Sequence, residues 1–253
     1  MKILGVDSSG LTASTAVFVD GNIVAVNSVN NNKTHSQTLL PMIELVMKQA
    51  ELDVKELDGI AVAEGPGSFT GLRIGAATVK GLALAINKPI IPVSTLMGLA
   101  YNFAGSGNIV CPIMDARRGQ VYTAAYRFNE NNIEDNVIEE INSPEAVAIE
   151  EVLSRYKCMG QIDVVNEEDR VIFLGDGVKV YEEKIREELG IAAKIAPAHL
   201  RLQNAASIAV LGAKLYEEGK TVTGAEFEPV YLRLSQAERE RLDKEKTEKE
   251  GSL

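Results

Sequence analysis

The sequence is poor in the side chains from which metal centres and disulfide frameworks are built. It has two cysteines, Cys111 and Cys158, and two histidines, His35 and His199, among 253 residues. The cysteines are far apart and form no CxxC pair. This scarcity excludes a zinc-finger type of cluster and favours buried thiols in a reducing compartment over disulfides. We therefore expect no metal site.

The sequence also lacks a long apolar run. The first run has only four residues, between Lys2 and Asp7, which is too short for a signal peptide or a membrane span. No other run approaches the roughly 20 residues that a spanning helix needs. Hydrophobic residues make up 45% and charged residues 25%, close to the averages for soluble proteins. We expect a cytoplasmic protein without a membrane segment.

Positive charge is scarce as well. The chain has 26 lysines and arginines against 36 aspartates and glutamates, which gives a formal net charge of −10. Proteins that bind nucleic acid unaided usually present a basic face, because neutralising phosphates supplies much of the affinity. This total is compatible with a local basic patch, but it argues against unaided RNA binding. Any contact with RNA is therefore expected to run through a partner.

The first half of the chain has the pattern of an α/β sheet with helices on its faces. It begins with apolar segments typical of strands, two of them joined by a turn at Gly21, and continues with alternating strands and helices. Ser94 or Thr95 is expected to cap the third helix. The predicted elements are strands over 2–7, 12–20, 22–30, 60–63 and 90–93, and helices from about 35 and over 71–86.

The second half repeats this order after a glycine-rich boundary at 102–108. Each half starts with a hairpin and continues into strand–helix units, which indicates an internal duplication with the second copy eroded. The predicted elements are strands over 110–115, 120–128 and 171–175, an exposed turn over 129–136, and helices over 144–156, 180–189 and 204–218.

These patterns predict two lobes and a tail. The N-terminal lobe covers 1–103, and the helix at 204–218 packs back on it, while 104–203 form a smaller C-terminal lobe. Residues 234–253 alternate acidic and basic side chains with almost no large apolar residue, so we expect a disordered segment or a solvated helix there.

The most informative segment is a glycine-rich turn between a predicted strand and the helix over 71–86. Such a turn is able to point backbone N–H groups at an anion. No Gly-Lys-Ser/Thr follows and GxGxxG is not matched, so neither standard nucleotide motif is present. Spacing alone leaves an anion site and a tightly packed turn equally open. The segment comprises Gly65, Pro66, Gly67, Ser68, Phe69, Thr70 and Gly71.

The first two predicted helices carry wider apolar stripes than one sheet contact needs. The helix over 71–86 is apolar nearly all round, so it must be covered on two sides, by its own fold or by a partner protein. Packing within the fold is the commoner explanation, but both helices together suggest a helical docking surface. Its predicted residues are Leu39, Leu40, Ile43, Val46, Met47, Leu72, Gly75, Ala76, Val79, Leu82 and Ala83.

Five segments, in the same order along the chain, resemble the signatures of the TsaB (YeaZ) family. The resemblance extends over about residues 1–233 and leaves only the tail outside. The segments are GVDSS at 5–9, HS with LLP between 35 and 41, GPGSFTGLR at 65–73, MDARRGQVY at 114–122 and PVYLR at 229–233.

The resemblance implies a fold of the actin/Hsp70/sugar-kinase (ASKHA) type with two related lobes, the second reduced. It implies a non-catalytic partner subunit in tRNA threonylcarbamoyladenosine biosynthesis. The paralogue TsaD transfers the threonylcarbamoyl group onto the adenosine next to the anticodon, and the ATPase TsaE is a third component. Family members pair with themselves in isolation or with TsaD through the two early helices, and they meet tRNA only through the complex.

The positions that serve catalysis in TsaD are altered in this chain. Thr95 and Leu99 stand where the resemblance places the two metal-binding histidines of TsaD. The segment Asp7, Ser8 and Ser9 keeps only a vestigial phosphate loop. We expect no catalytic residue and no cofactor of its own, which leaves ATP or ADP only at an interface shared with TsaD.

The other nucleotide elements point the same way. The second phosphate-loop equivalent, 115–118, lacks paired glycines, and Asp176 places a negative charge between Gly175 and Gly177. Two alternatives remain open. An ATP-dependent kinase of a small metabolite would use Asp7 and Asp115 around a magnesium nucleotide. A metallopeptidase would need a zinc site that two separated histidines do not supply.

Overall fold

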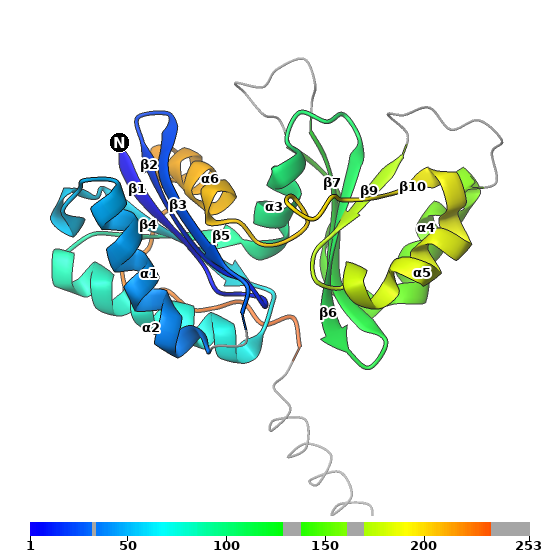
Figure 1. Cartoon of the computed structure of the whole chain (residues 1–253), viewed down its shortest axis with the longest axis horizontal. Helices are drawn as coiled ribbons and strands as arrows, with labels where there is room; N and C mark the ends of the chain where they lie inside the picture. Colours follow the sequence, from blue (N-terminus) through cyan, green and yellow to red (C-terminus); the bar gives the residue numbers. More distant parts are fainter. Residues whose placement is uncertain (32–33, 129–137, 161–169, 234–253) are drawn as a thin grey trace, which may run out of the picture.

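The protein consists of two lobes that lie side by side, each built on a five-stranded sheet (Figure 1). The computed structural model describes residues 1–31, 34–128, 138–160 and 170–233, with the backbone alone for 158–160. The exposed turn expected at 129–136, the thiol of Cys158 and the charged tail at 234–253 lie outside the described residues.

The first sheet has the strand order β3-β2-β1-β4-β5. The first three strands are antiparallel, whereas β1, β4 and β5 run parallel. Successive side chains of β1 point to opposite faces: Leu4 and Val6 contact α1 and α2, and Ile3 contacts α6. The elements are β1 (Lys2–Asp7), β2 (Ala13–Val19), β3 (Asn22–Val29), α1 (His35–Gln49), β4 (Gly59–Gly65), α2 (Phe69–Ile86) and β5 (Ile90–Ser94).

The second sheet repeats this arrangement element by element. Its order is β10-β9-β6-β7-β8, so β6 to β10 correspond to β1 to β5, and α4 and α5 correspond to α1 and α2. The duplicated lobes of an ASKHA-like α/β fold are therefore present. The elements are β6 (Ile109–Arg117), β7 (Gln120–Phe128), β8 (Ile138–Ala148), α4 (Ile149–Gly160), β9 (Val171–Leu174), α5 (Val178–Leu189) and β10 (Ala193–Ile195).

The second lobe is reduced in its helices and in two of its strands. The helices α4 and α5 have 12 residues each, against 15 in α1 and 18 in α2, and β9 and β10 have 4 and 3 residues, against 7 in β4 and 5 in β5. All five strands of the sheet are nevertheless kept. The sequence pattern also missed two strands, β8 and the three-residue β10. A strand this short has too few residues for alternation to be visible.

The helix predicted over 144–156 is wrong at its start. Residues 144–148 belong to β8, where Val147 pairs with Val121 of β7, and the helix α4 begins at Ile149. Pro144 falls where the register shifts between Thr123 and Ala125 on this edge strand. A bulge on an edge is a position where the missing N–H of proline removes no ladder hydrogen bond. Tertiary pairing therefore overrides the helical composition of this segment.

The helices α3 (Thr95–Ala100) and α6 (Ala205–Glu217) connect the lobes. The helix α3 follows β5 and packs on β6 and β7 as well as on α6. The helix α6 returns from the second lobe to cover the inner face of the first sheet, where the backbone N–H of Ala205 donates to Ser14 Oγ (2.9 Å). Glycines permit this close approach, since a Cβ on Gly212 would lie 2.3 Å from Cβ of Ala61.

After α6 the chain forms a C-terminal strap, residues 221–233. Val222 exchanges two backbone hydrogen bonds of 2.9 Å with Ile90 at the edge of the first sheet. Phe227 is buried in the first core, and the N–H of Val230 donates to the carbonyl of Glu64 (2.7 Å). The strap then passes beside the α2 end of the lobe toward the space between the lobes (Figure 1).

Among the described residues, α2 is the one helix long and apolar enough to cross a bilayer. Its apolar side chains have a different use in this fold. Leu72, Val79 and Ala83 are buried, and the helix packs on β4 and β5. One side of α2 therefore belongs to the core, while most of its residues are partly or fully exposed.

Two glycines in helices offer a matched test of the packing of α6. Alanine raises helix propensity at both positions, but Gly81 has nothing within 4 Å of a new Cβ, whereas Gly212 faces Ala61. We expect Gly212→Ala to destabilise the protein by about 1–3 kcal/mol. Gly81→Ala should stabilise it by about 0.5–1 kcal/mol. Urea unfolding of both variants measures this, and equal effects would contradict the tight contact.

Candidate functional site

The glycine-rich segment at 65–71 comprises the end of β4, the β4–α2 loop and the first turn of α2, and it lies directly against the β1–β2 loop. The N–H of Ser68 donates to the carbonyl of Ser9 (2.6 Å), and Ser8 Oγ donates to the carbonyl of Gly71 (2.9 Å). A Cβ on Gly67 would lie 2.4 Å from the Ser9 carbonyl oxygen, and one on Gly71 would lie 2.1 Å from that of Ser8. These two glycines are therefore needed for contact between two loops of the same chain.

The vestigial phosphate loop is engaged in the same internal contacts. Asp7 is only 1% exposed, and its Oδ1 accepts hydrogen bonds from the backbone N–H (2.9 Å) and the hydroxyl (2.6 Å) of Ser9. Burial raises the pKa of the Asp7 carboxyl to about 6, although the Ser9 hydrogen bonds oppose the shift. The polar groups of Asp7, Ser8 and Ser9 are thus bonded within the protein.

Thr95 and Leu99 lie on α3, and both are buried. Thr95 Oγ1 accepts a hydrogen bond from the N–H of Gly65 (3.1 Å), so this side chain positions the start of the β4–α2 loop. The histidines lie elsewhere. His35 Nε2 is 2.8 Å from the carbonyl oxygen of Gly10, and His199 is exposed in the loop before α6. Across the described ranges no three His, Cys, Asp or Glu side chains gather in a metal-binding arrangement.

A cleft of about 520 Å³ lies between the lobes, with the two loops on one side and the β6–β7 hairpin on the other. The strap adds Tyr231 and Arg233, whose guanidinium donates to the carbonyl of Ala116 (2.7 Å) and so links the lobes. Its lining is formed by Ser9, Gly10, Leu11, Gly67, Ser68, Phe69, Thr70, Met114, Asp115, Ala116, Arg117, Arg118, Tyr122, Asp176, Lys179, Val180, Tyr231 and Arg233.

The two carboxyl groups in this cleft cap backbone N–H groups. Asp176 Oδ1 accepts from the N–H of Asp115 (3.1 Å), and Asp115 Oδ1 accepts from the N–H of Arg117 (2.8 Å). Burial raises the pKa of Asp176. Both acids thereby shape the turns that line the cleft, in place of the paired glycines of a second phosphate loop.

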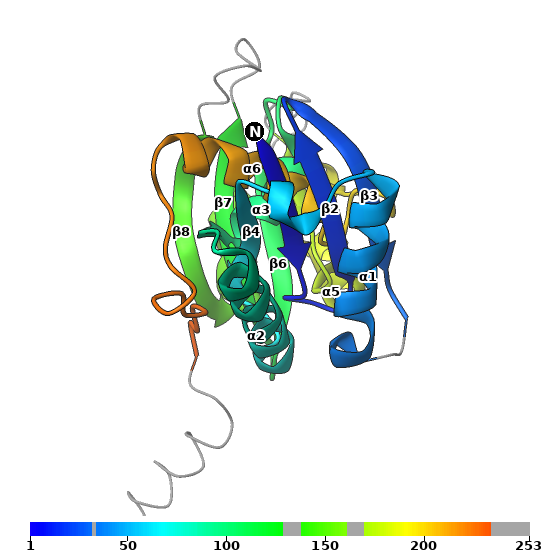
Figure 2. The same cartoon turned by 90° about the vertical axis from the view of Figure 1, so that its left-hand side faces the viewer.

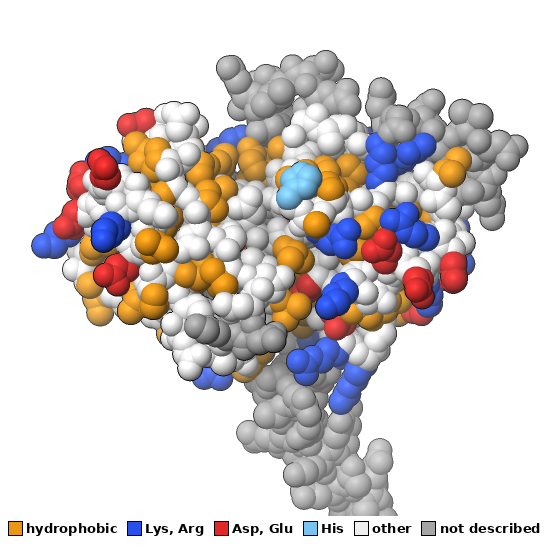
Figure 3. Space-filling view, in the orientation of Figure 1, with side chains coloured by type: hydrophobic (Ala, Val, Ile, Leu, Met, Phe, Trp, Pro, Cys, Tyr) orange, Lys and Arg blue, Asp and Glu red, His pale blue; other side chains and the backbone are white. Residues whose placement is uncertain are grey.

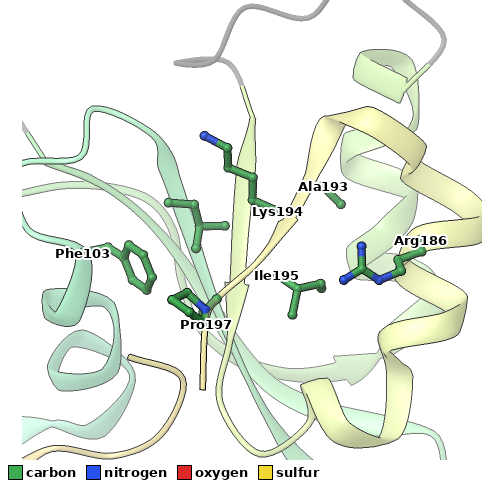
Figure 4. A pocket seen from close by; sticks show the side chains of 8 residues that line it. Phe103, Arg186, Ala193, Lys194, Ile195 and Pro197 are labelled. Carbon is green, nitrogen blue, oxygen red and sulfur yellow. The ribbon is translucent and has the colours of Figure 1, made fainter. Parts of the chain in front are cut away.

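A second hollow, of about 420 Å³, lies beside β10 on the second lobe (Figure 4). Its floor is apolar, with Ile195, Pro197 and Phe103 around it. Two cations border it: Arg186, whose guanidinium donates to Glu182 one turn away, and Lys194 of β10. The other side chains that line this hollow are apolar.

Comparison with known proteins agrees with this architecture. The sequence model of the family described as "TsaD: tRNA N6-adenosine threonylcarbamoyltransferase" matches residues 25–241. The Bacillus subtilis protein named tRNA threonylcarbamoyladenosine biosynthesis protein TsaB is 31% identical over 247 residues, covering 97% of this chain and all of that protein. The chain belongs to the TsaB (YeaZ) family.

Two further relatives extend this family match. The Escherichia coli protein of the same name is 31% identical over 92% of this chain and 95% of its own length. A solved structure described as YeaZ from Pseudomonas aeruginosa superposes with a TM-score of 0.72 at 25% identity, covering 91% of this chain and 99% of that one. The family likeness thus extends over both lobes.

The residues predicted for a docking surface require a correction. Leu40 is 60% exposed and Leu82 is partly buried, but the other nine are buried in the lobe itself and have no surface to offer a partner. The stripes are wide because α1 and α2 contact each other as well as the sheet. Both helices lie on the side of the first lobe that faces the viewer in Figure 2. The buried nine are Leu39, Ile43, Val46, Met47, Leu72, Gly75, Ala76, Val79 and Ala83.

The exposed sides of the same helices carry apolar side chains among charged ones. Leu84 is 84% exposed, Leu40 60% and Leu45 45%, and Ala77 and Ala85 of α2 are exposed as well. The exposed charged residues of the two helices are Glu44, Lys48 and Arg73. Hydrophobic side chains gather over this part of the first lobe (Figure 3). The sequence pattern did not distinguish this exposed side from the buried one, because small side chains and leucines occur on both sides of α2.

The raised pKa of Asp7 makes stability depend on pH. The unfolded carboxyl titrates near 3.8 and the folded one near 6, so the folded state holds the extra proton between these values. The unfolding free energy should therefore fall as pH rises from 4 to 6 and level off above that. The Asp7→Asn variant lacks this carboxyl, so over the same pH range we expect its unfolding free energy to fall by about 2–3 kcal/mol less than that of the wild type. Urea unfolding from pH 4 to 7 measures it, and parallel curves for both proteins would refute it.

Proposed function

We propose that this protein acts in tRNA threonylcarbamoyladenosine biosynthesis as a non-catalytic subunit that docks and activates the transferase TsaD. The proposal rests on one observation: the residues at the positions that catalysis would need make hydrogen bonds within the chain. Asp7, Ser8 and Ser9 are bonded within the chain, and Thr95 holds the β4–α2 loop. The named function of the two TsaB relatives supports the pathway.

The exposed sides of α1 and α2 are the proposed docking face, comprising Leu40, Leu45, Ala77, Leu84 and Ala85. Small side chains on α2 let a partner helix approach closely, and Gly81 adds to this because nothing occupies the space where its Cβ would be. Exposed apolar area of this kind favours a protein partner over solvent. A charge at Val79 would not test docking, because that side chain lies in the core.

The same face is proposed to serve a homodimer when the protein is alone. Homodimer and heterodimer then compete for one surface, so added TsaD should convert dimers into mixed complexes. In this proposal TsaE joins the complex, tRNA is modified there, and ATP or ADP binds only at the interface shared with TsaD. The complex works in the cytoplasm.

A small-metabolite kinase is not favoured by the same geometry. That activity would need Asp7 to reach a magnesium nucleotide, but its Oδ1 is occupied by Ser9 and the side chain is buried. A metallopeptidase would need a cluster of zinc ligands. His35 and His199 lie on different segments, one beside Gly10 and the other in the loop before α6.

A charge on the docking face should prevent pairing without unfolding the chain. Leu84→Glu places a carboxylate at a highly exposed position, where it is solvated in the monomer but loses water in a complex. We expect the dissociation constant for TsaD to rise at least a hundredfold, which corresponds to about 3 kcal/mol, so that the two proteins no longer co-elute. Ile191→Glu, at a half-exposed position on the second lobe, is the matched control. Equal binding by both variants would exclude this face.

The activity itself is tested by reconstitution. Purified chain, TsaD and TsaE are assayed for threonylcarbamoyl transfer to tRNA, together and with each component left out. We expect transfer only when this chain and TsaD are both present. Modification by this chain alone, or ATP turnover that Asp7→Asn abolishes, would overturn the non-catalytic role.

A further inference from the structure

Basic side chains outnumber acidic ones around the cleft between the lobes, in a chain whose total charge is −10. Four cations line it, against the two carboxyl groups of Asp115 and Asp176, which accept hydrogen bonds from backbone N–H groups. Arg117 and Arg118 are exposed on the β6–β7 hairpin, Lys179 is exposed at the start of α5, and Arg233 comes from the strap. Lys and Arg side chains are visible along this lower edge of the second lobe (Figure 3). The net charge of the whole chain therefore differs in sign from the local charge at this edge.

These cations differ from many others in how they are partnered. Elsewhere on the second lobe, Arg155, Lys157 and Lys184 form ion pairs with glutamates. Within the described residues, no such pair involves Arg117, Arg118 or Lys179. Unpaired cations retain their full charge for a ligand.

The backbone holds the two hairpin arginines in an uncommon conformation. Arg117 has a φ of 64° and Arg118 a φ of 58°, a left-handed conformation that non-glycine residues rarely adopt because it is strained. The Asp115 side chain fixes the turn by accepting from the N–H of Arg117. A turn that keeps arginines where glycine would be less strained indicates that their side chains are used.

Aromatic rings border the cleft beside these charges. Phe69 is 38% exposed and Tyr231 is 40% exposed, and their ring centroids are 4.8 Å apart. The guanidinium of Arg73 lies 5.4 Å from the Phe69 centroid. Tyr122 lines the same cleft from β7. Cations interleaved with exposed rings are the composition with which proteins hold single-stranded nucleic acid.

We propose that this cleft is an RNA-binding surface, on which Arg117, Arg118 and Lys179 contact phosphates of a single strand while Tyr231 and Phe69 stack against a base. The inference rests on the proposed function, since tRNA is the substrate of that complex, and it adds a direct contact by this chain. The charges lie along the rim on two elements of the second lobe, which suits a strand more than one compact phosphate group. The loop that would hold a nucleotide phosphate is already bonded internally.

The test is fluorescence anisotropy of a labelled single-stranded RNA with the full chain. Three phosphate contacts predict a dissociation constant of roughly 10–100 μM at low salt, and a log–log salt slope of about −2. The double variant Arg117→Gln/Arg118→Gln should bind about tenfold more weakly, with a slope smaller by about 1.4. The matched control is Lys48→Gln/Lys55→Gln, which changes two exposed lysines, one in the last turn of α1 and one in the short 3-10 helix at 54–56 that follows it.

Three results would overturn the inference. The first is that the wild type does not bind RNA at low salt. The second is that both double variants lose the same amount of RNA affinity. The third is that ATP displaces the labelled RNA as effectively as unlabelled RNA does. The last would make the cleft a site for free nucleotide phosphate. Co-elution with TsaD separates the two proposals. A chain that fails to bind TsaD refutes the proposed function, whereas one that binds TsaD but not RNA refutes only this inference.

Discussion

The contact between the β1–β2 and β4–α2 loops is the constraint on which the site depends. Two backbone segments meet so closely that Gly67 and Gly71 have no room for a Cβ, and Ser8 and Ser9 supply the hydrogen bonds. The contact fixes where α2 begins, and thereby which side of α2 faces the sheet and which faces outward. It also consumes the polar groups with which a loop of this shape would hold a phosphate.

The same contact shapes the cleft. Because the β4–α2 loop lies on the β1–β2 loop, one wall of the cleft is formed by Gly67 to Thr70, and the strap crosses that wall to reach the second lobe. Phe227 anchors the strap in the first core, and Arg233 bonds to Ala116 across the cleft. The lobes are thus joined through α3, α6 and the strap. The cleft surface therefore spans both lobes. The exposed cations lie on the second lobe, and the Phe69 ring lies on the first.

The two copies of the fold have diverged in their outer surfaces more than in their sheets. Both sheets keep five strands in the same order, while α1 and α2 are longer than α4 and α5 and present leucine and alanine to solvent. The helices α4 and α5 instead expose acids and bases that pair with each other, as Lys157 does with Glu188. The first lobe is accordingly the one suited to a protein partner, and the edge of the second lobe carries the unpaired cations.

The sequence by itself determined most of the strands, the helices α1, α2, α5 and α6, and the duplication, because apolar periodicity is a local property of each segment. It also determined the family, through motifs spread over both lobes. Only the tertiary structure decided that residues 144–148 form a strand, because pairing with β7 outweighs local preference. It also decided which sides of α1 and α2 are exposed, since a stripe such as Val79 to Ala83 has the same periodicity against a core as against a partner. The sequence also did not reveal the cations around the cleft. They come from positions 117, 118, 179 and 233, and only folding brings them to one cleft.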